Sequence, residues 1–91
     1  MDYEKTIAEL HELADSLSIR IRYEKGDFDG GYCILHEERL IVVNKKLSPQ
    51  RKATVIALSI REFGLENVYL KPALREFIED EAAKARRGAA A

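Results

Sequence analysis

The chain has 91 residues, of which 46% are hydrophobic and 34% charged, and its 15 basic residues nearly balance 16 acidic ones. This length supports one domain with a small core, and the charge balance leaves no overall footprint for nucleic acid or an anionic membrane. The longest apolar run, Leu40-Ile41-Val42-Val43, is too short to span a bilayer. Because the first residues do not resemble a signal peptide and the lone Cys33 cannot form an internal disulfide, we expect a cytoplasmic protein.

The first part of the chain changes from a helical to an extended period. An apolar stripe predicts a helix over residues 3–17, formed by Tyr3, Ile7, Leu10, Ala14 and Leu17. Residues 19–24 then alternate between apolar and charged side chains, which is typical of a half-buried strand. Glycines and aspartates cluster over residues 25–31 and predict a loop.

Two further strands are expected over residues 32–36 and 40–44, joined by a short turn over residues 37–39. The nearly continuous apolar run in the second of them favours burial on both faces, in the middle of a sheet. Since connections this short join antiparallel neighbours, we predict a three-stranded and mostly antiparallel sheet.

Two helices are expected to complete the fold. Ser48-Pro49 is a favourable helix start, and Gly64 is a favourable stop after Phe63. The last helix should run from Pro72 to about Arg87, with the following side chains inward: Leu74, Phe77, Ile78, Ala82 and Ala85. The expected fold is therefore α+β, with an N-terminal helix, the sheet and two C-terminal helices packed on it. It should form a single domain over residues 1–87, with a flexible tail over residues 88–91.

No motif for metal binding or catalysis is complete. The segment His11-Glu12-Leu13-Ala14-Asp15 approaches the zinc-protease helix signature, but an aspartate stands where the second histidine is required. The loop that begins at Asp27 starts like a calcium loop, yet Tyr32 occupies the position that requires glycine. Cys33 is expected to be a small buried hydrophobe, on the strand face opposite His36, so the two cannot form a dyad. We expect no cofactor, no metal and no catalytic residue.

One segment is similar to a known family. The residues Leu40-Ile41-Val42-Val43-Asn44, Leu47-Ser48, Arg51-Lys52 and Ile56-Ala57 resemble the approach to the active-site helix in ImmA/IrrE-type zinc metallopeptidases. The likeness covers about half of the chain, and its register places the zinc motif at Leu58-Ser59-Ile60-Arg61-Glu62. Both histidines are missing there, and Ser59 stands at the position of the general base. The resemblance implies a trimmed, metal-free relative that kept the scaffold, in a group of short bacterial proteins.

The leading functional hypothesis is a binding module that acts through a protein partner or as a homodimer. The missing catalytic motifs, the balanced charge and a small core that would gain from an interface all favour it. Among the aromatic side chains that could anchor an interface, Tyr23 and Tyr32 are explained by core packing on strand period. The expected partner contacts are therefore Phe28, its neighbour Asp29, and Tyr69.

Two alternatives stay open. The first is a small-molecule enzyme that uses hairpin carboxylates as acid and base, drawn from Asp27, Asp29, Glu37 and Glu38. The second is a weak nucleic-acid binder that uses Arg20 and Arg22 or the basic last turn over residues 84–87. Its stacking surface would be incomplete, because Tyr23 points to the other face of the strand.

Overall fold

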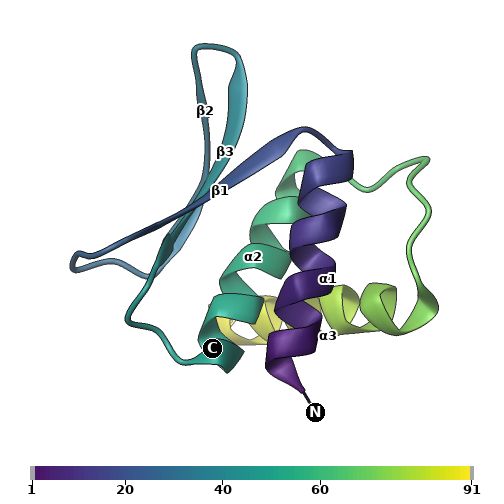
Figure 1. Cartoon of the computed structure of the whole chain (residues 1–91). Helices are drawn as coiled ribbons and strands as arrows, with labels where there is room; N and C mark the ends of the chain where they lie inside the picture. The colour runs from purple at the N-terminus through teal and green to yellow at the C-terminus, as the bar shows by residue number, and fades with distance from the viewer. Residues whose placement is uncertain (1, 91) are drawn as a thin grey trace.

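The computed structural model describes residues 2–90. In chain order its elements are α1 (Tyr3–Ser16), β1 (Ile19–Glu24), β2 (Gly30–Leu35), β3 (Glu38–Asn44), α2 (Pro49–Phe63) and α3 (Pro72–Ala90). Helices α1 and α2 lie side by side against one face of the sheet, and α3 crosses beneath them (Figure 1). The α+β class is confirmed. No helix within residues 2–90 is long and apolar enough to cross a membrane.

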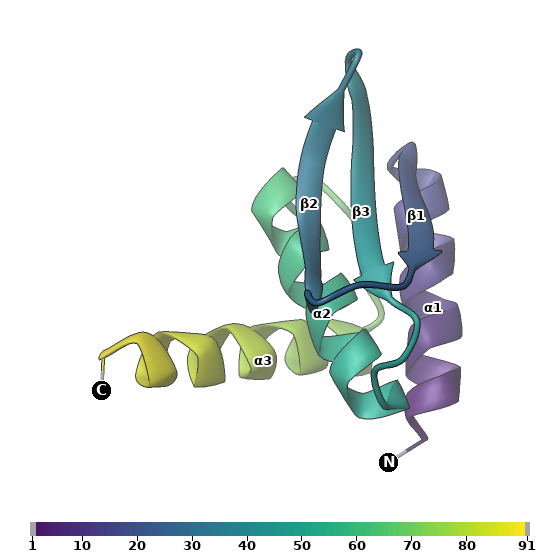
Figure 2. The same cartoon turned by 90° about the vertical axis from the view of Figure 1, so that its left-hand side faces the viewer.

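The sheet is mixed, and the expectation of a mostly antiparallel sheet is wrong for β1. The strand order is β1-β3-β2, with β1 parallel and β2 antiparallel to β3. The loop over residues 25–29 does not close a hairpin between neighbours but carries the chain across the end of β3 (Figure 2). Strand β3 is therefore central, as its apolar run predicted.

Asn44 holds this crossing loop in place. Its side chain lies at the end of β3 and is only 8% exposed. The amide nitrogen Nδ2 donates to the carbonyl oxygens of Gly26 at 2.8 Å and Phe28 at 2.7 Å, and Oδ1 accepts from the backbone N–H of Lys46 at 3.0 Å. One buried amide thus provides hydrogen-bond partners for backbone groups of the crossing loop and of the segment that follows β3.

We expect Asn44→Asp to lower the free energy of unfolding by about 2–3 kcal/mol, because a carboxylate cannot donate to the two carbonyl oxygens and instead repels them. The measurement is urea denaturation at neutral pH. Asn67→Asp is the matched control, since Asn67 is exposed and has a φ of 62°, a conformation that aspartate tolerates. Equal denaturation midpoints for the two variants would show that the crossing does not depend on this amide.

The β2–β3 hairpin is tighter than expected. Its turn consists of His36 and Glu37, with φ values of 52° and 70°, so the prediction of a turn over residues 37–39 is wrong. Positive φ at both central residues is typical of a two-residue type I′ turn. Neither residue is a glycine or asparagine, which explains why the sequence did not signal this turn.

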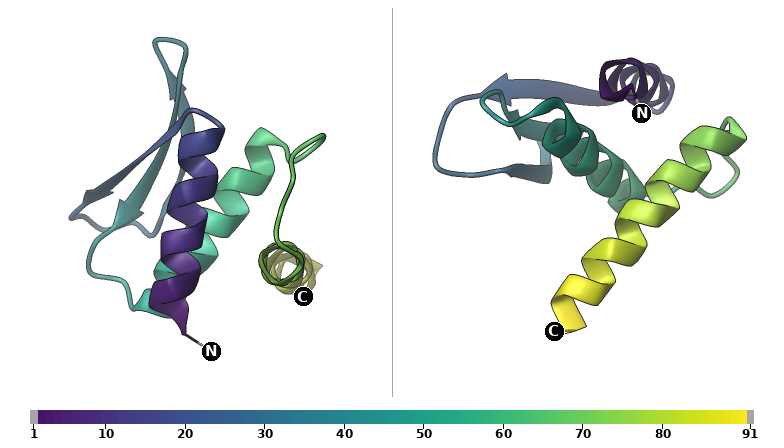
Figure 3. Two further views of the ribbon diagram at one scale, coloured as in Figure 1. Left: turned by 45° about the vertical axis from the view of Figure 1, so that its right-hand side comes forward. Right: turned by 90° about the horizontal axis from the view of Figure 1, so that it is seen from below.

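The core lies between the helices and the helix-facing side of the sheet. Its fully buried members are Leu10, Ile41, Val43, Ala53, Ile56, Ala57, Ile60 and Ile78. Most of the predicted helix faces are confirmed, but Ala85 is exposed because the end of α3 projects beyond α2 (Figure 3). Helix α3 also continues past Arg87 to Ala90, whereas Ala91 lies outside the described residues.

Candidate functional site

The partner contacts expected from the sequence do not form one surface. Phe28 and Asp29 lie in the crossing loop at the edge of the sheet, whereas Tyr69 lies in the link between α2 and α3, on the other side of the helices (Figure 1). Phe28 is 40% exposed, and its ring folds back over Gly26, where a Cβ atom would overlap it. Asp29 forms an ion pair with Arg51 of α2. Phe28 and Asp29 therefore belong to the sheet edge, and Tyr69 does not.

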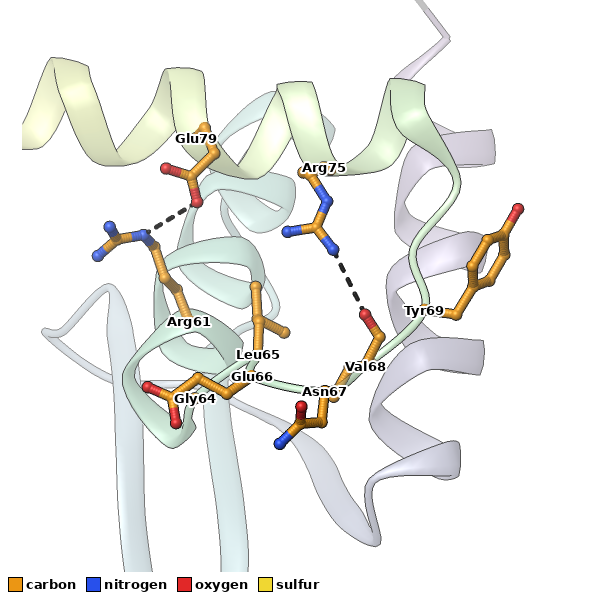
Figure 4. Close-up of a pocket in the computed structure, with 9 residues that line it drawn as sticks. All are labelled: Arg61, Gly64, Leu65, Glu66, Asn67, Val68, Tyr69, Arg75 and Glu79. Atoms are coloured by element: carbon orange, nitrogen blue, oxygen red, sulfur yellow. Dashed lines mark hydrogen bonds and ion pairs between the residues drawn. The ribbon is translucent and has the colours of Figure 1, made fainter.

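Tyr69 borders a hollow of about 710 Å³ that is open to solvent between α3 and the α2–α3 link. Tyr69 is 85% exposed, and its side chain points away from the other lining residues (Figure 4). Both arginines of the hollow already have partners, since Arg61 pairs with Glu79 at 3.5 Å and Arg75 donates to the Val68 carbonyl at 3.3 Å. The two arginines and the two glutamates of the lining, Glu66 and Glu79, balance in charge, and both arginines already have partners.

Strand β2 exposes more apolar surface than the rest of the sheet. Tyr32 is 49% exposed, Ile34 67% and Leu35 50%. Tyr32 faces the helices, because its ring contacts Phe63 edge-on at 5.2 Å between ring centres. Ile34 shares that face by strand alternation, but the hairpin rises beyond the helices and leaves it uncovered (Figure 1). The strand therefore presents apolar side chains at an open edge of the sheet.

The backbone of β2 alternates between bonding to β3 and facing that open edge. The Asn44 N–H donates to the Asp29 carbonyl at 2.9 Å, and the register runs without interruption from Gly30↔Val43 to Leu35↔Glu38. In an antiparallel ladder every second residue pair exchanges hydrogen bonds. Gly30, Tyr32 and Ile34 therefore direct their N–H and C=O groups away from β3, into solvent.

A groove of about 600 Å³ lies beneath this edge, between β2 and α2. Its apolar lining includes Tyr32, Val55 and Leu58, while Ser59 and Glu62 contribute polar atoms from α2. The residues at positions 58, 59 and 62, which the resemblance assigns to a zinc motif, thus line one side of a groove. No group of three histidine, cysteine, aspartate or glutamate side chains suited to a metal ion occurs within residues 2–90.

A buried carboxylate bonds to Thr54, one of the residues that line this groove. Glu81 of α3 is 9% exposed and accepts hydrogen bonds from Thr54 Oγ1 at 2.6 Å and Lys84 Nζ at 3.0 Å. Burial alone would raise the pKa of Glu81, but these bonds and the charge of Lys84 outweigh it and lower the pKa below its ordinary 4.5. The ionised form of Glu81 therefore stabilises the contact between α2 and α3.

This pKa shift predicts a pH dependence of stability. A carboxyl group whose pKa is lowered by folding stabilises the protein above its unfolded pKa, near 4.5, and loses this contribution as the pH falls through the lower folded value. We expect Thr54→Val, which removes one donor, to raise the pKa of Glu81 and to flatten the stability profile below pH 4.5. Thermal unfolding across this range checks it, with Thr6→Val as control, since the Thr6 hydroxyl bonds only the Asp2 carbonyl. Parallel profiles for the parent and Thr54→Val would contradict the assignment.

The structure separates the groups on which the two alternative functions depend. Asp29 and Glu37 flank opposite ends of β2, and the expected carboxylates do not converge on one hollow. Arg20 and Arg22 lie on the helix-free face of the sheet, where they pair with Glu38 at 3.3 Å and Glu24 at 3.2 Å. The arginines are thus already neutralised by neighbouring carboxylates.

The remaining titratable residues also differ from expectation. Cys33 is exposed on the helix-free face of β2, so its expected burial is wrong. His11 is partly covered, and its Nε2 lies 2.7 Å from the hydroxyl oxygen of Tyr23, with the rings stacked. Burial raises the pKa of Tyr23, which keeps this phenol protonated at neutral pH. His11 therefore has a structural contact between α1 and β1.

These observations define a small α+β protein with a mixed sheet, an open β2 edge and an adjoining groove. A search with protein-family models, curated proteins and solved structures finds no match for the chain. The candidate site is thus assigned from its own geometry. The sequence contained one signal for it, because residues 30–35 carry no charge and begin with Gly30-Gly31.

Proposed function

We propose that the protein is a non-catalytic protein-interaction module whose contact surface is the open edge of β2. The observation that carries this proposal is a difference between the two edges of the sheet. Edge strands are normally protected by charged residues, and β1 carries Arg20, Arg22 and Glu24. Strand β2, in contrast, has no charged residue and exposes apolar side chains. An unprotected edge of this kind favours pairing with another chain.

In this proposal the module works in the cytoplasm with a protein partner. Phe28 and Asp29 flank the start of β2 and extend its contact surface, whereas Tyr69 would make a separate contact. Leu58, Ser59 and Glu62 of α2 line the groove. Their position supports a second element of the proposal, namely that the chain is a metal-free relative of a zinc-peptidase scaffold that retained a groove for another chain.

Site-specific photocrosslinking in the native host tests this function. Ile34 is replaced by a photoreactive amino acid, and the matched control carries the same group at Glu76, an exposed position on α3. We expect adducts with a defined protein from position 34 only, and the same adduct from the purified components. Adducts that form equally at both positions, or at neither, would contradict a contact surface at β2.

A further inference from the structure

We propose that the β2 edge binds an extended peptide segment of a partner protein, which adds to the sheet as a further strand and covers the groove over α2. The segment would carry apolar residues at alternate positions and a basic residue near Glu62. This inference rests on the proposed function and specifies the chemistry of the partner.

The backbone of β2 provides the specific hydrogen bonds. Tyr32 and Ile34 direct their N–H and C=O groups to the open edge, two residues apart along the strand. An extended segment repeats its own groups at the same spacing, so it can exchange bonds with both residues. Peptide recognition by strand addition uses the same arrangement, with affinity from the main chain and selectivity from pockets for alternate side chains.

Helix α2 provides a floor for the added strand. The C-terminal half of α2 reaches past the edge of β2, so the helix layer is wider than the sheet (Figure 2). The groove there is lined by Val55 and Leu58 of α2 beside Tyr32 of β2. Side chains on one face of an added strand would lie on this apolar floor, which explains the preference for apolar residues at alternate positions.

The charge of the groove lining determines which charge in the partner segment is favoured. Asp29 and Arg51 neutralise each other in an ion pair, whereas Glu62 forms no ion pair within residues 2–90. The remaining charge on the lining is therefore that of one carboxylate. A lysine or arginine in the added segment would complement it, and an acidic residue would be repelled.

The shape of the edge favours a single segment over a second copy of this chain. Pairing of β2 with the β2 strand of a second copy about a twofold axis would bring the second α2 into the space that the first already occupies beyond the sheet edge (Figure 2). A lone extended segment brings no helix layer. It therefore fits the space beside β2 without this conflict.

The test uses a short blocked peptide in which valines alternate with threonines and one lysine, added to the ¹⁵N-labelled protein. We expect shifts of the backbone amides of Tyr32, Ile34 and Leu58. A matched peptide that is N-methylated at the amides facing β2 should bind at least about tenfold more weakly, because its donors are lost. Replacing the lysine by glutamate should weaken binding about threefold or more, and added salt should reduce this difference.

Protein variants give a second readout. Leu58→Lys places a charge in the groove floor and should weaken binding of the lysine peptide about tenfold. Ala73→Lys is the control, since Ala73 is exposed on α3 and does not line the groove, so it should leave binding unchanged. Amide shifts outside the groove report whether each variant keeps the fold.

Four results would overturn the inference. Equal binding of the N-methylated peptide, or shifts confined to the α2–α3 link, would exclude strand addition at β2. Shifts of β2 amides that depend on protein concentration without peptide would assign the edge to a second copy and leave the proposed function intact. No shift at millimolar peptide would refute this partner chemistry, and photocrosslinking at Ile34 would then decide the proposed function separately.

Discussion

Replacing Ile56 by alanine should lower the free energy of unfolding by about 2–5 kcal/mol. Ile56 is completely buried on α2 and belongs to the cluster that joins Leu10 of α1, Ile41 of β3 and Ile78 of α3. Removing its methyl groups leaves a cavity where all layers of the fold meet, and the stability of a small domain is only about 5–15 kcal/mol. Urea denaturation followed by circular dichroism measures the loss.

Val55→Ala is the matched control for this prediction. Val55 precedes Ile56 on the same helix, but it is only partly buried and lines the groove. Its truncation removes fewer buried methyl groups and replaces a β-branched residue by a better helix former, so we expect a loss of about 1 kcal/mol or less. If the two variants lost equal stability, the assignment of the inner face of α2 would be wrong.

The helices could be predicted from the sequence because their signals are local. Asp2 accepts a hydrogen bond from the Lys5 N–H at 3.1 Å, and Ser48 caps α2 in the same way through Arg51. Gly64 ends α2 with a φ of 98°. Caps, stop residues and the helical period all act within a few residues, so each can be recognised without knowing the rest of the fold.

The order of the strands could not be predicted in the same way. The loop over residues 25–29 is short enough for a hairpin, which favoured direct antiparallel pairing of β1 with β2 as neighbours in the sheet. The structure inserts β3 between them, with the loop held by Asn44 from a distant part of the chain. Such a contact between distant residues leaves no periodic pattern in the sequence.

The candidate site was missed for a related reason. Whether Tyr32 and Cys33 are buried depends on where β2 lies in the sheet and on how far the hairpin projects beyond the helices. Strand alternation correctly placed Tyr32 on the helix-facing side, but it could not show that β2 is an edge strand. Exposure at this edge is a property of the assembled sheet. The absence of charged residues over 30–35 indicates an unprotected edge only once the strand order shows that β2 lies at the edge of the sheet.

Replacing Gly30 by alanine should lower the free energy of unfolding by about 2–4 kcal/mol and should disturb the start of the β2 edge. Gly30 has a φ of 139°, which side-chain-bearing residues rarely adopt, and strain of this kind costs about 1–3 kcal/mol. A Cβ atom would also overlap the backbone oxygen of Val42 and lie 3.0 Å from Val55 Cγ1. The backbone of β2 would have to move away from β3 to accept it.

Gly31→Ala separates this geometric cost from a general effect of glycine replacement. Gly31 has no positive φ, and a Cβ there would meet no atom within 4 Å. Because alanine restricts the unfolded chain, we expect Gly31→Ala to be neutral or stabilising by about 0.4–1 kcal/mol. Urea denaturation of both variants, with the peptide titration repeated on each, makes the comparison. Similar losses of stability at the two positions would mean that the close approach of Gly30 to β3 does not set the geometry of this edge. A loss at Gly30 alone would show that the crossing loop fixes where the open edge begins.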